Sequence, residues 1–280
     1  MRVLLTNDDG VEAQGLAAAR EALLHAGVGV ITAAPDVPRS GTSRSASFRK
    51  PISLARHGGT DANPIYAVNG TPTDTVRAAI LSGTAAGIDA VVSGINEGIN
   101  LGDDATYSST LGAAMEGALL GYPSIAASQQ TVDGRFRLID LTGYDFDMGA
   151  RILARLTQIT IEDRAQLPPR SVLNLNSPGR PAKGLQLAHF DERVWGTDSI
   201  YSVRSETGEL GYLLFGTHPE NDPVFRMMPG SDAWVLAQGL ASVTPINLKW
   251  GSTTGRSRLQ RWTRTAVARV NNDLFGTRGA

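Results

Sequence analysis

The sequence predicts an α/β protein: a Rossmann-like, doubly wound and mostly parallel sheet, followed by a C-terminal β-hairpin or arm segment. Two observations support this fold class. Short apolar runs, typical of strands buried on both faces, alternate with segments whose apolar residues recur at helical spacing. The alternation continues through residues 1–180. A parallel sheet requires such an order, because each crossover between neighbouring parallel strands normally contains a helix.

The first βαβ unit occupies the N-terminal 34 residues. Its strands are expected at residues 2–6 and 28–34, and the helix between them, at residues 12–26, carries an apolar stripe that includes Leu16 and Leu23. The same alternation predicts further strands at residues 65–68, 88–92, 124–127 and 172–175. Further helices are expected at residues 73–81, 110–120 and 146–156, the last with Asp145 as a candidate cap.

Three regions follow from these patterns, the first being a Rossmann-like core at residues 1–180. Beyond it the chain has short extended pieces, 186–189 and 211–215, between polar loops. We interpret residues 181–250 as a hairpin and oligomerisation arm that completes the domain. A small subdomain packed on its own core would also fit this pattern.

Residues 251–280 form a basic tail, with six arginines and one acid, Asp273. Apolar residues at near-helical spacing predict a terminal helix docked by that stripe. The alternative is a helix that binds a membrane surface or a partner. The stripe consists of Leu259, Trp262, Ala266 and Val270.

Composition excludes several classes of protein. The net charge of −1 gives no field that attracts a nucleic-acid polymer or a membrane, and no apolar run approaches the ~18 residues of a membrane span. We therefore expect a cytoplasmic protein. The chain has no cysteine, its four histidines lack ligand spacing, and neither a P-loop nor a dinucleotide-binding glycine motif occurs. Disulfides and thiolate zinc sites are excluded, and zinc catalysis, P-loop ATP hydrolysis and nicotinamide chemistry are disfavoured.

Polar clusters follow three of the expected strands. Asp8 and Asp9 come after the first strand, Ser40 after the second, and Asn96 after residues 88–92. In a doubly wound sheet these loops open on the same crevice, so the four side chains can converge. Two carboxylates, a hydroxyl and an amide carbonyl are the hard oxygen ligands that suit Mg²⁺ or Mn²⁺.

A fourth cluster, Ser108-Ser109-Thr110, precedes the helix expected at residues 110–120. Hydroxyls and unpaired N–H groups at a helix N-terminus bind anions, phosphate above all. A cation site and an anion site at one crevice predict a pocket for a phosphate ester. Ser108 to Thr110 could instead be an ordinary helix cap.

Two further clusters have competing interpretations. Asn7-Asp8-Asp9-Gly10 could be a turn that caps the helix near residue 12. Asp103 and Asp104 could be a second carboxylate pair in the site or a solvated loop edge.

The chain resembles the SurE family of survival-protein nucleotidases. The resemblance lies in short motifs at residues 4–10, 34–41, 69–74, 91–96 and 100–117, with a weaker match at residues 230–245. It implies a metal-dependent phosphatase acting on nucleoside 5′- and 3′-monophosphates, with one divalent cation per subunit. It also implies a homodimer or tetramer formed through exchanged C-terminal arms.

The resemblance further assigns roles to individual residues. The metal ligands of the family correspond to Asp8, Asp9, Ser40 and Asn96. The phosphate-side residues correspond to Gly41, Ser43, Ser108, Ser109 and Thr110.

Two residues depart from the family pattern. Ser109 stands where the family usually has glycine, which puts a side chain where backbone would approach a phosphate. Glu97 stands where a small residue is common, and its charge could weaken anion binding or bind a second cation.

We therefore expect a metal-dependent phosphomonoesterase with Asp8 and Asp9 as catalytic residues. Either a metal-bound water or one of these carboxylates attacks phosphorus. Two alternatives use the same fold: a non-catalytic regulator that binds metal and nucleotide, and a transferase that uses a metal-held sugar nucleotide.

Overall fold

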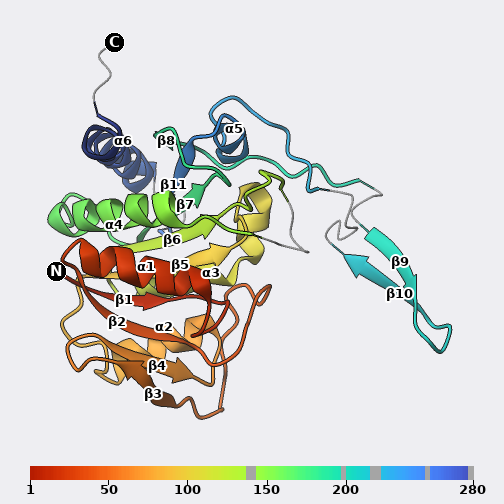
Figure 1. Ribbon diagram of the computed structural model, residues 1–280, viewed down its shortest axis with the longest axis horizontal. Coiled ribbons are helices and arrows are strands. Elements are labelled where there is room, and N and C mark those ends of the chain that lie inside the picture. Colours follow the sequence, from red (N-terminus) through yellow and green to blue (C-terminus); the bar gives the residue numbers. More distant parts are fainter. Residues whose placement is uncertain (137–142, 197–199, 215–221, 250–252, 277–280) are drawn as a thin grey trace.

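A nine-stranded sheet forms the centre of the protein (Figure 1). The computed structural model describes residues 1–136, 143–196, 200–214, 222–249 and 253–276. The strands of this sheet, in spatial order, are β3 (Leu54–Gly59), β4 (Pro64–Val68), β2 (Gly29–Pro35), β1 (Arg2–Thr6), β5 (Ala90–Glu97), β6 (Ser124–Gln129), β7 (Ser171–Ser177), β11 (Ala241–Asn247) and β8 (Leu185–Leu187).

The six strands from β4 to β7 are parallel to one another, which confirms the predicted fold class and the central position of β1. The two edges of the sheet depart from this regularity. β3 is antiparallel to β4, and β11 is antiparallel to β7 but parallel to β8. Because β1 lies between β2 and β5, the segments that follow these three strands emerge at the same edge of the sheet.

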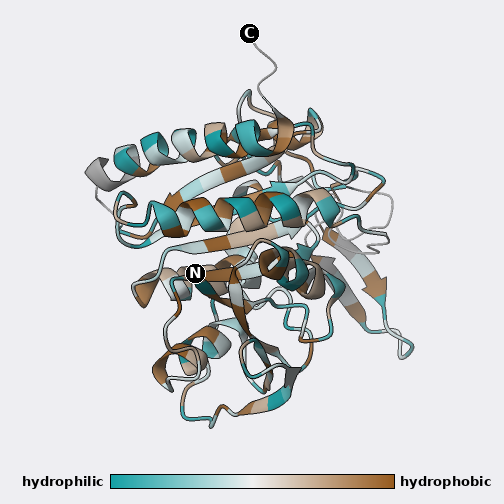
Figure 2. Ribbon diagram, turned by 60° about the vertical axis from the view of Figure 1, so that its left-hand side comes forward, coloured by the Kyte–Doolittle hydropathy of each residue, from teal (hydrophilic) through white to brown (hydrophobic). Residues whose placement is uncertain are grey.

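Helices cover both faces of the sheet (Figure 1). One face carries α1 (Gln14–His25), α4 (Asp147–Glu162) and α6 (Thr253–Phe275), whose buried residues belong to a single apolar cluster. The other face carries α2 (Pro72–Leu81) and α3 (Ser109–Leu119), which pack against each other. Figure 2 shows hydrophilic and hydrophobic residues alternating along the helices, as expected for helices that bury one face.

The predicted elements are all present, with shifted ends. β5 extends to Glu97, five residues beyond its predicted end, and α4 extends to Glu162. The Asp145 carboxylate accepts a hydrogen bond from the first backbone N–H of α4, that of Asp147, at 3.1 Å. Two short helices, α5 (Asp232–Ala237) and the 3-10 helix η1 (Gly102–Tyr107), and the strands β3, β9 (Ile200–Arg204) and β11 were not predicted.

The C-terminal tail forms the expected docked helix. The four residues of its apolar stripe are each at most 6% exposed. In the described residues, no helix is both long enough and apolar enough to cross a membrane.

A two-stranded hairpin projects from the rest of the molecule (Figure 1). It consists of β9 (Ile200–Arg204) and β10 (Leu210–Leu214), which pair with each other and not with the large sheet. The predicted extended pieces therefore correspond to β8 and β10, although Phe215 lies outside the described residues.

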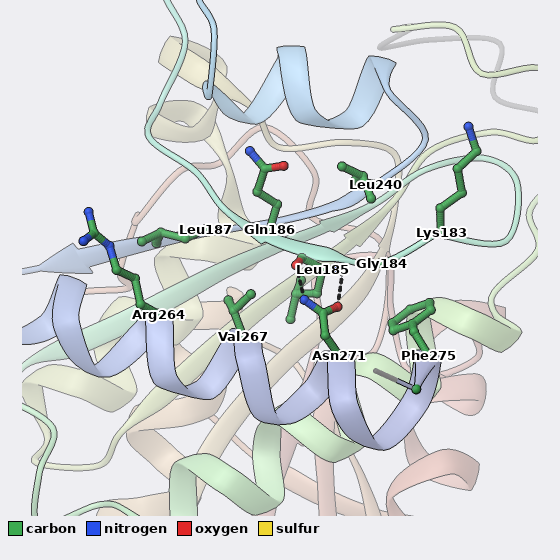
Figure 3. A pocket seen from close by; sticks show the side chains of 11 residues that line it. Lys183, Gly184, Leu185, Gln186, Leu187, Leu240, Arg264, Val267, Asn271 and Phe275 are labelled. Carbon is green, nitrogen blue, oxygen red and sulfur yellow. Dashed lines mark hydrogen bonds between the residues drawn. The ribbon is translucent and has the colours of Figure 1, made fainter. Parts of the chain in front are cut away.

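The edge strand β8 is fastened to α6 by one side chain. The Asn271 Oδ1 atom accepts a hydrogen bond from the Leu185 backbone N–H, and Nδ2 donates to the Leu185 carbonyl, both at 2.9 Å (Figure 3). The amide therefore satisfies the two backbone groups that Leu185 turns away from β11.

We expect Asn271→Ala to destabilise the protein by about 2 kcal/mol, because it leaves two backbone groups of a buried residue without these partners. Chemical unfolding followed by circular dichroism would measure this. Asn272→Ala is the matched control, since Asn272 is exposed one residue further along the same helix. Equal stability of the two variants would contradict the role given to Asn271.

Candidate metal and phosphate site

The carboxylates of Asp8 and Asp9 lie directly after β1 in a turn built by Asn7. The Asn7 side chain accepts a hydrogen bond from the Gly10 N–H at 3.3 Å and donates to the Gly10 carbonyl at 2.9 Å. α1 begins only at Gln14, with no side-chain cap. The predicted turn is therefore present, but Asn7 closes it without capping the helix, and both carboxylates are left for other contacts.

Asp8 and Asn96 face the same hydroxyl group, which comes from α3. The Thr110 hydroxyl, in the first turn of α3, donates to Asp8 Oδ1 at 2.5 Å and lies 3.1 Å from Asn96 Oδ1. Asn96, near the end of β5, donates from Nδ2 to the Gly98 carbonyl at 2.9 Å. This bond fixes the orientation of the amide, so that its oxygen faces the same hydroxyl as Asp8.

Asp9 lies on the other side of the pair, against β5. Its Oδ2 atom accepts a hydrogen bond from the Glu97 N–H at 3.0 Å. Burial, the charge of Asp8 and then that of Glu97 together raise the pKa of Asp9 to about 7. Burial also raises the pKa of Asp8, against the hydrogen bonds from Thr110. Two crowded carboxylates of this kind favour a cation between them.

The chain at Ser40 is held next to Asp8 by main-chain contacts. The Arg39 N–H donates to the Asp8 carbonyl at 2.7 Å. Two residues after Ser40, the Thr42 N–H donates to Ser109 Oγ at 2.9 Å. The structure thus places Asp8, Asp9 and Asn96 at the ends of β1 and β5 beside the first turn of α3, and it places the backbone of the residue before Ser40 against Asp8. In the described residues no three His, Cys, Asp or Glu side chains form a metal-binding group, so a cation here would need the neutral oxygens of Ser40 and Asn96.

The remaining predicted residues contact protein groups. Ser108 is the N-cap of α3, and its Oγ accepts the Leu111 N–H at 3.1 Å, as in the capping alternative. Ser43 donates to the Thr106 carbonyl at 2.9 Å. Gly41 has φ +71° and nothing within 4 Å of the position that a Cβ would occupy. Any anion contact from this region would therefore come mainly from backbone N–H groups, which a helix N-terminus and a glycine turn both offer.

The loop after Asn96 is anchored by residues that sequence reasoning did not assign. Arg193 donates its backbone N–H to Asp103 at 2.9 Å, and its guanidinium pairs with Asp104. Both acids thus bind Arg193: Asp103 is exposed, as in the solvated-edge interpretation, whereas Asp104 is half-buried in an ion pair. No local pattern could show this, because the partner lies about ninety positions away along the chain.

Asp232, at the start of α5, fastens the same loop. Its carboxylate accepts hydrogen bonds from the backbone N–H groups of Gly102, Asp191 and Ala233, at 2.9 to 3.0 Å. The side chain is fully buried, and this burial raises its pKa to about 6.

An open cleft of about 380 Å³ adjoins Asp9. Its walls combine apolar and acidic side chains, among them Val11, Val37, Asp36 and Glu97. A larger groove of about 900 Å³ lies between β8 and α6 (Figure 3). None of the predicted site residues lines that groove, so its size does not make it the site.

The fold and the site define a Rossmann-like protein that gathers two carboxylates, an amide and a helix N-terminus where β1 and β5 end. The chain belongs to the SurE family. The family model described as "Survival protein SurE" matches residues 3–197.

Curated relatives and a solved structure agree with this assignment. The chain is 40% identical over 272 residues to the 5′-nucleotidase SurE of Rubrobacter xylanophilus, covering 94% of this chain and 97% of that protein. It is 37% identical to the 5′-nucleotidase SurE of Geobacter sulfurreducens, covering 94% of each chain. The crystal structure of the SurE protein from Aquifex aeolicus matches with a TM-score of 0.70 and 31% identity, over 94% of this chain and all of that one.

We expect Asp232 to make the stability of the protein fall as the pH rises. Its pKa is raised from the ordinary 3.8 to about 6 in the folded state, so its contribution is fully present below about pH 4 and is lost as the pH rises through 6. Asp232→Asn destabilises the protein at every pH, because an amide oxygen cannot accept all three hydrogen bonds. The stability difference between wild type and Asp232→Asn should shrink by an amount on the order of 2 kcal/mol between pH 4 and pH 7.

Urea unfolding at a series of pH values would measure this difference. Asp61→Asn is the control, because Asp61 is exposed. A difference between wild type and Asp232→Asn that stays constant from pH 4 to pH 7 would refute the assignment of this titration to Asp232.

Proposed function

We propose that this protein is a metal-dependent phosphomonoesterase, a 5′-nucleotidase that hydrolyses nucleoside 5′- and 3′-monophosphates to nucleoside and phosphate. The observation that carries the proposal is the crowded pair Asp8 and Asp9, set against the first turn of α3 through Thr110. The names of the relatives, 5′-nucleotidase SurE, support the same reaction.

The donor set fits one divalent cation per subunit, Mg²⁺ or Mn²⁺. Asp8, Asp9, Ser40 and Asn96 would hold it, all through oxygen atoms, and two carboxylates whose pKa values are raised would be stabilised in their charged form. When bound, the cation supplies charge neutralisation for the phosphoryl oxygens and a lowered pKa for a coordinated water.

The protein's own groups orient the reaction. Thr110 and the Gly98 carbonyl keep the oxygens of Asp8 and Asn96 facing the same point. Gly41, Ser43, Ser108, Ser109 and Thr110 are the proposed phosphate-binding residues, contributing largely through backbone N–H groups. Either a water molecule attacks phosphorus directly, or the carboxylate of Asp8 or Asp9 attacks first and a water molecule then hydrolyses the aspartyl phosphate. In both routes the P–O ester bond breaks, the ester oxygen leaves with the nucleoside and takes up a proton, and the water oxygen ends in the released phosphate.

The cleft beside Asp9 is a suitable place for the nucleoside. Asp36 follows β2 directly, the position from which Rossmann-like proteins accept hydrogen bonds from ribose hydroxyls. Val11 and Val37 offer apolar contact to a base or sugar. The acidic walls would repel a second phosphate group, which favours monophosphates over longer phosphate chains.

We expect Asp8→Asn to lose phosphate release from nucleoside monophosphates by ~100-fold or more while remaining folded, because a neutral amide binds a divalent cation weakly. Colorimetric phosphate assays with Mg²⁺, Mn²⁺ or EDTA would test this on a panel of 5′ and 3′ esters. Asp61→Asn serves as the control. Tight nucleotide binding without any phosphate release by the wild-type protein would instead favour the non-catalytic regulator.

The proposed assembly is a homodimer or tetramer formed through exchanged C-terminal arms, with residues 1–180 as the catalytic core, residues 181–250 as the arm and residues 251–280 as the tail. The support comes from the β9–β10 hairpin. It extends away from the core and leaves large apolar side chains about half exposed, and a two-stranded hairpin alone is marginally stable in water (Figure 1). These side chains are Ile200, Leu210, Tyr212 and Leu214.

We expect Tyr212→Asp to reduce the molar mass in solution towards that of one chain, 29.6 kDa, because it places a charge in the proposed contact. Size-exclusion chromatography with light scattering would show the change. Thr207→Asp, which adds the same charge at the exposed turn of the hairpin, should leave the assembly unchanged. A single-chain mass for the wild-type protein would contradict the proposed assembly.

A further inference from the structure

We infer that Ser109 is a positioning residue, whose hydroxyl holds the Ser40 loop (residues 39–42) beside Asp8 and thereby sets the affinity for the cation. The inference rests on the proposed function, in which Ser40 is one of four ligands. It gives Ser109 a task different from contact with the phosphate.

The hydroxyl of Ser109 binds both ends of the Ser40 loop. Ser109 is the first residue of α3 and has no exposed surface. Its Oγ atom accepts the Thr42 N–H at 2.9 Å, donates to the Arg39 carbonyl at 3.1 Å and lies 3.0 Å from Thr42 Oγ1. Residues 40 and 41 therefore lie between two anchored ends, and Ser109 binds both of them, together with the Thr42 hydroxyl, which also donates to the Arg39 carbonyl.

The same loop is joined to the carboxylate pair from the other side. The Arg39 N–H donates to the Asp8 carbonyl at 2.7 Å, while the Arg39 carbonyl accepts from Ser109. One peptide segment thus connects α3 to the end of β1, and Ser40 follows it directly. The Ser109 contacts therefore act on the residue that immediately precedes Ser40, next to its bond with Asp8.

The side chain of Ser40 is not held by packing. Ser40 is exposed, and Gly41 borders open space on the side where a Cβ would project. The next side-chain contacts with the rest of the protein come later in the chain: Ser43 donates to the Thr106 carbonyl, and Arg44 pairs with Glu116. The position of Ser40 therefore depends on hydrogen bonds rather than on packing.

Removal of the hydroxyl should loosen the loop without disturbing the helix. Ser108, the residue before, caps α3 through its own hydroxyl, and Thr42 Oγ1 also donates to the Arg39 carbonyl at 3.0 Å. Ser109→Ala thus removes the hydrogen bonds of the Ser109 hydroxyl, while the Thr42–Arg39 hydrogen bond in the loop and the Ser108 cap of α3 remain. Loss of the net contribution of one hydrogen bond is expected to weaken binding of the cation by Ser109→Ala roughly threefold to tenfold.

The experiment is a double-mutant cycle read out as Mn²⁺ affinity, measured by titration calorimetry without substrate. The four proteins are wild type, Ser109→Ala, Ser40→Ala and the double variant. Each single substitution should weaken Mn²⁺ binding, and the double variant should bind no more weakly than Ser40→Ala, because Ser109 acts through Ser40. Ser82→Ala, an exposed position, should bind as wild type does.

Ser109→Cys gives a graded check and a second variant, since a thiol is slightly larger than a hydroxyl, retains a donor and an acceptor, and forms weaker hydrogen bonds. Its Mn²⁺ affinity should lie between those of wild type and Ser109→Ala. Thermal unfolding of each variant shows that the comparison is made on folded protein.

Other outcomes separate the two proposals. If Ser40→Ala weakens binding and Ser109→Ala does not, or if the two losses simply add, the inference about Ser109 is overturned while the proposed function stands. If Ser40→Ala binds Mn²⁺ as wild type does, Ser40 is not a ligand and the inference fails with it. If the wild-type protein binds no divalent cation, the proposed function itself fails.

Discussion

The structure depends on the placement of two adjacent carboxylates at the end of a fully buried strand. Asp8 is 3% exposed, and burial opposes the charged form of both acids. The protein keeps them there by surrounding them with donors from separate parts of the chain: the Thr110 hydroxyl from α3 and the Glu97 N–H from β5. The order of the parallel strands makes this possible, since β5 lies beside β1 and α3 is the next helix along the chain.

A chain of contacts extends outward from this pair. Thr110 contacts both Asp8 and Asn96, and Ser109 joins α3 to the loop after β2 by hydrogen bonds. Asp232 and Arg193 bind the loop after β5 and so join it to the C-terminal region. Each contact joins a loop that follows a strand to an element from a distant part of the sequence. Loops that carry functional groups thereby gain fixed positions without being buried.

Sequence reasoning was successful where one short segment determines the outcome. The apolar run of β1 and the carboxylates after it are local features, and the parallel order follows from alternation of strands and helices. β11 was not predicted, and its Pro245 is unusual in an interior strand. The structure shows why the proline is tolerated. The Val243 carbonyl accepts a hydrogen bond from the Ala188 N–H, on the β8 side of β11. Because backbone groups two residues apart in a strand point to the same side, the Pro245 nitrogen also points away from β7, at a place where β8 has already ended. β3 was missed because an edge strand needs no apolar run.

The finer geometry of the site could not be predicted. Hydroxyl groups at 109 and 110 are equally able to bind an anion, cap a helix or bind a neighbouring loop, and only the fold decides between these uses. The pairing of Asp104 with Arg193 joins residues far apart in sequence. The orientation of the Asn96 amide follows from its bond to Gly98, two residues away, which a spacing pattern does not reveal.

The amide of Asn271 has a consequence for how this sheet meets other chains. An open edge strand is a template on which another polypeptide can add a strand, and it is a common origin of uncontrolled aggregation. By occupying the outward N–H and carbonyl of Leu185, the helix blocks growth of the sheet at the β8 edge. At the opposite edge, β3 presents Arg56 and His57 with an irregular register at that point, which also discourages strand addition. Both edges of the large sheet are therefore poor templates for an added strand, and the projecting hairpin is a separate two-stranded unit.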